Sequence, residues 1–244
     1  MTEFVIDTCK AQKGRETLIY VLSDIHGNTS RFHSVLNQIT WGENDWLYVL
    51  GDMADRGADG IAIMEELMHR PNTVVLQGNH ERMLLDVFHE PDNEKFTNRW
   101  HRNGGDVTKQ AFDALPQGRK DALISWLENL PLEVNLEING QKYCLVHAAP
   151  RELYDQFETD NDLDMYTVWY RVQPEEKLFS DRITVFGHTP TEHFQSTMPM
   201  SVWYGDHRIA IDCGAAYEEP GCRLACVRLD DGKIFYSKEN AQLV

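Results

Sequence analysis

The chain has 244 residues, a length that suits one large domain with its own hydrophobic core. Its formal net charge of −16, from 23 basic and 39 acidic residues, opposes binding to a nucleic-acid polymer, because that binding depends on a surface rich in lysine and arginine. Hydrophobic residues make up 42% of the chain, but no run approaches the ~20 apolar residues of a membrane span, so we expect no membrane partner either.

At the N-terminus, residues 1–24 contain no basic region followed by an apolar core. We therefore expect no export signal and a cytoplasmic protein. The five cysteines include no Cys-x-x-Cys pair. This pattern is typical of reduced core cysteines, and it argues against both a disulfide framework and a thiolate zinc site.

Five apolar runs of strand length are rich in Val, Ile, Leu or aromatic residues and are predicted to be buried strands. They span residues 18–23, 46–51, 73–78, 143–148 and 183–188. Residues 31–39 and 60–70 lie between the first three runs and have helical spacing. This alternation of strand and helix is typical of a parallel sheet.

After the third run, residues 81–88 and 119–130 have the pattern of helices. Asn139-Gly140 and Asp231-Gly232 each lie between two strand-like segments, and such dipeptides favour the tight turn of a β-hairpin. The predicted fold class is therefore α/β with an antiparallel flank. Because no linker, repeat or low-complexity tract interrupts the chain, we predict a single domain over residues 1–244.

Polar side chains follow all five predicted strands, at the point where each strand ends. In α/β sheets, ligands bind beyond the carboxyl ends of the strands, so these residues are the candidates for a site. Asp24 and His26 are two residues apart, and an extended backbone would point both side chains the same way. The full set is Asp24, His26, Asp52, Asn79, His147 and His188.

This set offers oxygen and imidazole ligands without a thiolate, which favours a reactive metal site over a structural zinc site. Six ligands are too many for one tetrahedral ion and too few to fill two octahedral ions, so positions would remain open for water and substrate. The set therefore predicts a hydrolytic centre with two divalent ions. Mn²⁺ is the expected ion, with Fe²⁺ and Zn²⁺ as alternatives.

The order of these motifs resembles that of the calcineurin-like metallophosphoesterases, and specifically of the phosphoprotein phosphatase (PPP) family in its compact bacterial and phage form. The motifs that carry the resemblance are SDIHGN at 23–28, GDMADRG at 51–57, GNHE at 78–81, and the later His147 and His188. A further segment, WHRNGGDVTKQAF at 100–112, resembles the Trp-x-x-Asn-Gly-Gly segment of the small phosphatases in this group. The resemblance implies a four-layer α/β/β/α fold, with a central β-sandwich of mixed sheets flanked by helices and a dimetal site at the C-terminal strand ends.

The resemblance also implies which residues share each ion. Asp24, His26 and Asp52 would bind the first ion, and the second would be bound by Asp52, as a bridge, together with Asn79, His147 and His188.

Beyond the metal ligands, Arg56 is predicted to bind the substrate phosphate together with Asn79, because guanidinium groups match the geometry of phosphoryl oxygens. The resemblance implies the same role for Arg171, which matches an arginine that follows a tryptophan in the small phosphatases. His80 is the predicted general acid, and Asp55 is its predicted partner, which would orient the imidazole and raise its pKa. The alternatives are structural. Asp55 would then form an ion pair with Arg56 or cap the next helix, and His80 would only support a ligand.

By the resemblance, the predicted reaction is hydrolysis of a phosphomonoester by direct attack of a metal-bridging hydroxide, without a covalent intermediate. The predicted substrates are proteins or peptides phosphorylated on serine or threonine, with phosphotyrosine and small phosphomonoesters as alternatives. Two other functions stay open: a diadenosine-polyphosphate or nucleotide hydrolase of the same fold, and a non-catalytic phosphate-binding module. Substrate choice is expected to depend partly on residues 89–120, a predicted insertion over the active-site face.

Overall fold

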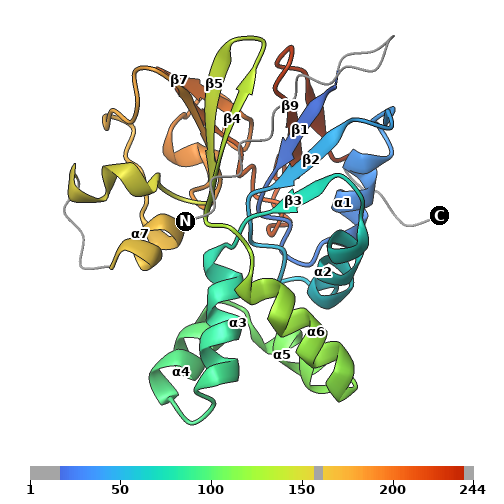
Figure 1. The fold of residues 1–244 in the computed structure, drawn as a ribbon. Helices are drawn as coiled ribbons and strands as arrows, with labels where there is room; N and C mark the ends of the chain where they lie inside the picture. Colours follow the sequence, from blue (N-terminus) through green and yellow to red (C-terminus); the bar gives the residue numbers. More distant parts are fainter. Residues whose placement is uncertain (1–16, 157–161, 239–244) are drawn as a thin grey trace.

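The computed structural model describes residues 17–156 and 162–238. In these residues, ten strands form two five-stranded mixed sheets that lie side by side in Figure 1. The first sheet has the order β10-β9-β1-β2-β3, from β1 (Ile19–Leu22), β2 (Trp46–Val49), β3 (Thr73–Val75), β9 (Ala225–Arg228) and β10 (Ile234–Tyr236). The second has the order β4-β5-β6-β8-β7, from β4 (Glu133–Ile138), β5 (Gln141–Val146), β6 (Ile183–Phe186), β7 (Trp203–Gly205) and β8 (Arg208–Ala210).

The helices cover the outer faces of the two sheets. Beside the first sheet lie α1 and α2, while α3 to α6 form a helical lobe at one end of the molecule and α7 lies on the side of the second sheet (Figure 1). None of the helices in the described residues is long and apolar enough to cross a membrane. Their bounds are α1 Thr29–Leu36, α2 Gly60–His69, α3 Asn79–His89, α4 Glu94–Arg102, α5 Asp106–Asp113, α6 Gln117–Glu128 and α7 Leu163–Trp169, with short 3₁₀ turns η1 Arg151–Gln156 and η2 Thr191–His193.

Strand β1 shows how the sequence pattern produces the layers. Its alternate residues Ile19 and Val21 belong to the core between the two sheets, whereas Tyr20 and Leu22 belong to the core under the helices of the first sheet. All four are buried, because both faces of a central strand are covered in a layered fold. A third core lies between the second sheet and α7. The predicted four-layer architecture is confirmed.

Two features differ from the predictions. The predicted insertion at 89–120 consists largely of helices, since it contains α4, α5 and the first residues of α6. The first three strands also end earlier than their apolar runs do, because the chain turns sharply before it reaches the polar residues.

Left-handed backbone follows the first two of these strands, β1 and β2. Asp24 and His26 have φ angles of 56° and 48°, so the expectation that extended backbone aligns their side chains is wrong. Six of the ten described non-glycine residues with positive φ are predicted site residues, namely Asp24, His26, Asp52, Asp55, Arg56 and His188. Each costs about 1–3 kcal/mol, and such strain gathers at functional sites where the surrounding structure holds it in place.

Gly27 joins the loop after β1 to the loop after β2. It has φ of +64°, and a Cβ at this position would overlap the backbone carbonyl of Gly57. Gly27 also donates its N–H to Met53 O at 2.8 Å. The two loops are therefore in backbone contact with no room for a side chain.

We predict that Gly27→Ala lowers the free energy of unfolding by about 2–4 kcal/mol, because the left-handed conformation and the overlap with backbone both oppose a Cβ. Urea denaturation measures this change. Gly118→Ala is the matched control: Gly118 lies in α6 with no atom within 4 Å of the place that a Cβ would take, and the exchange should stabilise the protein by up to about 1 kcal/mol. A Gly27→Ala variant within about 0.5 kcal/mol of the wild type would contradict the prediction.

Candidate metal centre and active site

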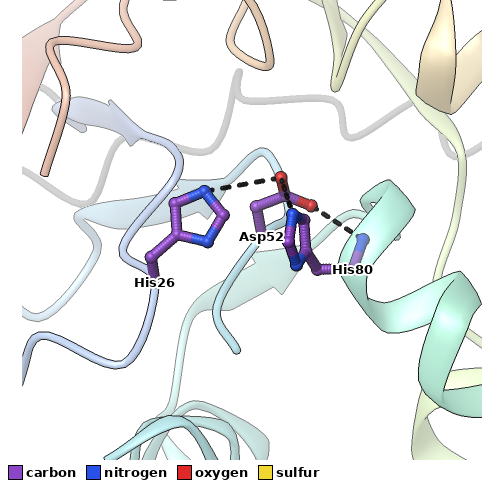
Figure 2. A group of neighbouring side chains, drawn as sticks. All are labelled: His26, Asp52 and His80. Atoms are coloured by element: carbon purple, nitrogen blue, oxygen red, sulfur yellow. Dashed lines mark hydrogen bonds and ion pairs between the residues drawn. The ribbon is translucent and has the colours of Figure 1, made fainter. Parts of the chain in front are cut away.

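The six predicted metal ligands are all buried and lie together where β1, β2, β5 and β6 end and α3 begins. Two groups of His and Asp side chains have ligand atoms within 4.8 Å of one another. His26, Asp52 and His80 form one group, which Figure 2 shows, and Asp52, His147 and His188 form the other. Asp52 belongs to both groups, which is the position that a bridging carboxylate requires.

The second group is arranged so that acceptor atoms face one another. The His147 Nδ1–H donates to Leu50 O at 2.7 Å, so its Nε2 carries a lone pair. The His188 Nε2–H donates to Trp169 O at 3.1 Å, which leaves the lone pair on Nδ1. Both lone pairs lie 3.0 Å from Asn79 Oδ1, itself an acceptor. Three acceptors without a proton among them repel one another unless a cation binds, so this group fits a divalent ion.

The first group has the same chemistry. His26 Nδ1–H donates to Ala54 O at 3.0 Å, which leaves a lone pair on Nε2. This Nε2 lies 3.9 Å from Asp24 Oδ1 and 3.7 Å from Asp52 Oδ2. The Arg56 guanidinium donates to the same Nε2 at 3.0 Å. The lone pair of His26 therefore lies close to the carboxylates of Asp24 and Asp52. The Arg56 guanidinium is the cation beside them.

Asp24 and His80 differ in part from their predicted places. Asp24, predicted to be a ligand, accepts the backbone N–H of His188 at 3.0 Å and is absent from the first group. His80, predicted to be an acid, is in that group, with Nε2 at 3.8 Å from Asp52 Oδ2. The Nδ1 atom of His80 bonds Asp55, so only Nε2 faces the centre.

Burial shifts the pKa of four side chains in this cluster towards the neutral form. It raises the pKa of Asp24, and the nearby Asp212 carboxylate raises it further. It also raises the pKa of Asp52, where Glu81 adds to the effect. Burial lowers the pKa of His26 and of His188, which keeps both imidazoles neutral. Neutral imidazole is the form that binds a metal, and bound cations would in turn favour the ionised carboxylates.

His80 and Asp55 form a buried pair beside the two groups. His80 Nδ1 lies 2.6 Å from Asp55 Oδ2, and the Trp100 indole N–H donates to the same oxygen at 2.8 Å. Burial raises the pKa of Asp55 to about 7. Burial also lowers the pKa of His80, which is opposite to the raised pKa that was expected. Asp55 does orient the imidazole, with Nε2 directed at the centre.

A cavity of about 210 Å³ opens onto these groups. Arg56 and Arg171 both line it. The Arg56 guanidinium lies 3.4 Å from His80 Nε2, and Arg171 donates to His188 O at 3.1 Å. Guanidinium groups match the geometry of phosphoryl oxygens. Other lining residues include Asn103, Trp169, Asp212 and Tyr217.

No role was predicted from the sequence for two buried residues at the site, Glu81 and Asp212. Glu81 is fully buried and accepts the backbone N–H groups of Asp52, Met53 and Gly78 at 2.8–2.9 Å. It thereby fixes the loop after β2 against the start of α3. Asp212 is buried at the cavity wall near Asp24. The only sequence signal was their position, Glu81 directly after GNH and Asp212 at the end of an apolar run.

Known phosphoesterases are similar to this chain in sequence. The family model described as calcineurin-like phosphoesterase matches residues 17–226. Serine/threonine-protein phosphatase 2 of Escherichia coli (strain K12) is 31% identical over 131 residues, which are 53% of this chain and 57% of that protein. The symmetrical bis(5'-nucleosyl)-tetraphosphatase of Erwinia tasmaniensis is 30% identical over 139 residues, which are 56% of this chain and 46% of that protein. The chain thus spans about half the length of these curated relatives.

A solved structure is similar over nearly the whole chain. It is described as a putative diadenosine tetraphosphatase and superposes with a TM-score of 0.63 at 17% identity, covering 90% of this chain and 92% of that one. At this identity the likeness concerns the fold alone.

Proposed function

This chain belongs to the calcineurin-like phosphoesterase family, and we propose that it is a dimetal phosphomonoesterase that hydrolyses phosphoserine and phosphothreonine in proteins or peptides. Phosphotyrosine and small phosphomonoesters are further substrates in this proposal. The observation that carries it is the convergence of unprotonated acceptors on two sites that share Asp52, next to a histidine–carboxylate pair and two arginines.

In this proposal, Asp24, His26 and Asp52 bind one divalent ion, and Asp52, Asn79, His147 and His188 bind the second. The ligand types suit Mn²⁺ first, then Fe²⁺ or Zn²⁺. When bound, two such ions neutralise charge on the phosphoryl oxygens and lower the pKa of a bound water towards ~7, so that hydroxide is available near neutral pH. No nucleophilic side chain is then required.

The remaining steps belong to the chain's own residues. Arg56 and Arg171 bind the phosphoryl oxygens, with Asn79 beside them, because charge spreads over those oxygens in the transition state. For this step the His80 ring must carry protons on both nitrogens, with Nδ1–H bonded to Asp55; the Nε2 proton passes to the departing alkoxide and leaves the ring neutral. Asp55 holds the ring in the orientation that presents Nε2. A serine or threonine alkoxide is a poor leaving group, so this proton transfer matters most for the proposed substrates.

The choice of protein substrates rests on two supports. The match to the E. coli phosphatase covers 57% of that protein, whereas the match to the tetraphosphatase covers 46% of that protein and a similar share of this chain, 56% against 53%. The cavity of about 210 Å³ is small and polar, which suits a phosphoryl group on a short side chain.

In this proposal residues 1–244 act as one domain in the cytoplasm. Four free cysteines are buried and suit a reducing compartment, namely Cys144, Cys213, Cys222 and Cys226.

The second candidate function is hydrolysis of a diadenosine polyphosphate. It is favoured by the similarity to the tetraphosphatase at an identity almost equal to that of the phosphatase, 30% against 31%. The same metal ligands and arginines would serve that reaction. The two functions differ in the leaving group and in what surrounds the phosphate, which makes them separable by kinetics.

We predict that, with Mn²⁺ present, kcat/KM for phosphoserine or phosphothreonine peptides exceeds that for diadenosine tetraphosphate by about tenfold or more, equivalent to about 1.4 kcal/mol in transition-state binding. Steady-state kinetics on both substrates, with phosphotyrosine peptides in parallel, measure the ratio. Chelation by EDTA should abolish both activities and re-addition of Mn²⁺ restore them. A large preference for the dinucleotide would replace the first function by the second.

A further inference from the structure

The motif WHRNGG and the residues after it have no role in the proposed reaction, yet they contact its histidine–carboxylate pair. Residues 100–108, here called the 100–108 segment, comprise the end of α4, the short connection and the start of α5, and they lie against the loop after β2. Trp100 is only 3% exposed. Its indole N–H donates at 2.8 Å to Asp55 Oδ2, the oxygen that also bonds His80 at 2.6 Å. The segment therefore reaches the imidazole through a single intervening carboxylate.

The 100–108 segment also holds the backbone on which that carboxylate is carried. Asp55 N–H donates to Thr108 Oγ1 at 2.9 Å, and Arg56 N–H donates to Gly104 O at 3.0 Å. Asp55 and Arg56 have φ angles of 70° and 66°, a conformation that L-residues avoid. A backbone in this conformation persists only when its surroundings hold it, and these two bonds are part of what holds it.

The double glycine of the motif makes this contact possible. A Cβ on Gly105 would overlap the indole ring of Trp100, and Gly104 has φ of +88° with the Arg56 side chain 3.0 Å from where its Cβ would lie. Gly105 therefore leaves room for the Trp100 ring, and Gly104 leaves room for the Arg56 side chain. The Trp, the Gly-Gly pair and the later threonine form one unit around Asp55.

We propose that Trp100 and Thr108 are positioning residues, which fix the Asp55 carboxylate so that His80 presents Nε2 to the leaving group. The helical lobe is then a part of the catalytic apparatus and not only an insertion over the cavity. This inference rests on the proposed function, specifically on His80 as general acid. Without the indole N–H, Asp55 keeps one bond to the imidazole and gains freedom to rotate, and the ring loses its fixed orientation.

The test is Trp100→Phe, assayed on two aryl phosphates that differ in their need for a proton. With phenyl phosphate, a poor leaving group, kcat should fall by about 10–100-fold, the usual cost of losing a group that orients a functional side chain. With 2,4-dinitrophenyl phosphate, which departs without a proton, kcat should fall less than about twofold. Bound metal per chain should stay as in the wild type. Trp126→Phe, in α6, is the matched control and should show no selective loss.

A second pair of variants decides the matter if Trp100→Phe does not fold. Thr108→Val removes the acceptor of the Asp55 N–H and should show the same selective loss, and Thr108→Ser, which restores the hydroxyl, should regain most of it. Equal losses on both substrates, or no loss on either, would overturn the inference.

Other results would refute the proposed function itself and not only the positioning role of Trp100 and Thr108. A wild type that hydrolyses neither aryl phosphate would refute that function, as would a His80→Asn variant whose losses do not depend on the leaving group. A selective loss in His80→Asn without one in the Trp100 or Thr108 variants refutes only the positioning role.

Discussion

Asp52→Asn is expected to leave the protein with less than one equivalent of divalent metal per chain, where the wild type binds two. Asp52 is the one residue common to both groups of ligand atoms, with Oδ2 at 3.7 Å from His26 and Oδ1 at 3.4 Å from His147. Losing its charge weakens both sites at once, by more than the ~10–100-fold that loss of a residue supporting a ligand costs. Phosphatase activity is expected to disappear with the metal.

Metal analysis of the purified variant gives the first readout, and thermal unfolding gives a second that does not depend on activity. Mn²⁺ at 100 times its Kd should stabilise the wild type by about 2.7 kcal/mol for each site, and it should stabilise the variant far less. Asp59→Asn is the matched control, because Asp59 is an exposed residue whose side chain forms no cap bond to α2. Two equivalents of metal in Asp52→Asn would disprove the bridging role.

His80→Asn is expected to keep both metal ions and to lower kcat by about 10²- to 10⁴-fold on a phosphomonoester with a poor leaving group. That loss corresponds to about 2.7–5.4 kcal/mol in the activation free energy. Asparagine retains a polar side chain, but it cannot deliver a proton to the alkoxide. Because the backbone N–H of residue 80 still donates to Asp52 Oδ1, at 3.1 Å in the wild type, the loop at the metal site should be undisturbed.

Steady-state kinetics and metal analysis on the same preparation check this expectation. His89→Asn makes the same exchange at the exposed end of the same helix, where His89 pairs with Glu128, and should leave kcat unchanged. Unchanged turnover in His80→Asn on phenyl phosphate would remove the histidine from the reaction. A loss of metal together with activity would instead make it a ligand, as its presence in the first group allows.

Much of the site could be predicted from sequence because the strands of a parallel sheet end at a common edge. Five apolar runs placed Asp24, Asp52, Asn79, His147 and His188 at such ends, and the structure brings these residues together. The pairing of His80 with Asp55 was likewise predicted, and the 2.6 Å contact agrees with it. Their chemical roles stay predictions until the variants are measured.

What could not be predicted depends on backbone conformation and on distant contacts. An extended backbone was expected to align Asp24 and His26, but both residues are left-handed, and the loop after β2 determines where they lie. The lobe formed by α4 and α5 was predicted only as a polar insertion, since its contact with Asp55 links positions 45 residues apart. Sequence spacing carries no information about such a contact.

Strand periodicity and ligand type are properties of local residues, so the α/β class and the candidate ligand set follow from the order of amino acids. The motifs carry the family resemblance, and the four layers were predicted from that resemblance. Which nitrogen of each histidine faces the centre follows only from the folded chain, through bonds such as that from His147 to Leu50 O. The same is true of Glu81, which fixes the loop of Asp52, and of Trp100, which contacts Asp55. These arrangements depend on hydrogen bonds between segments that only packing brings together, and burial makes such bonds obligatory.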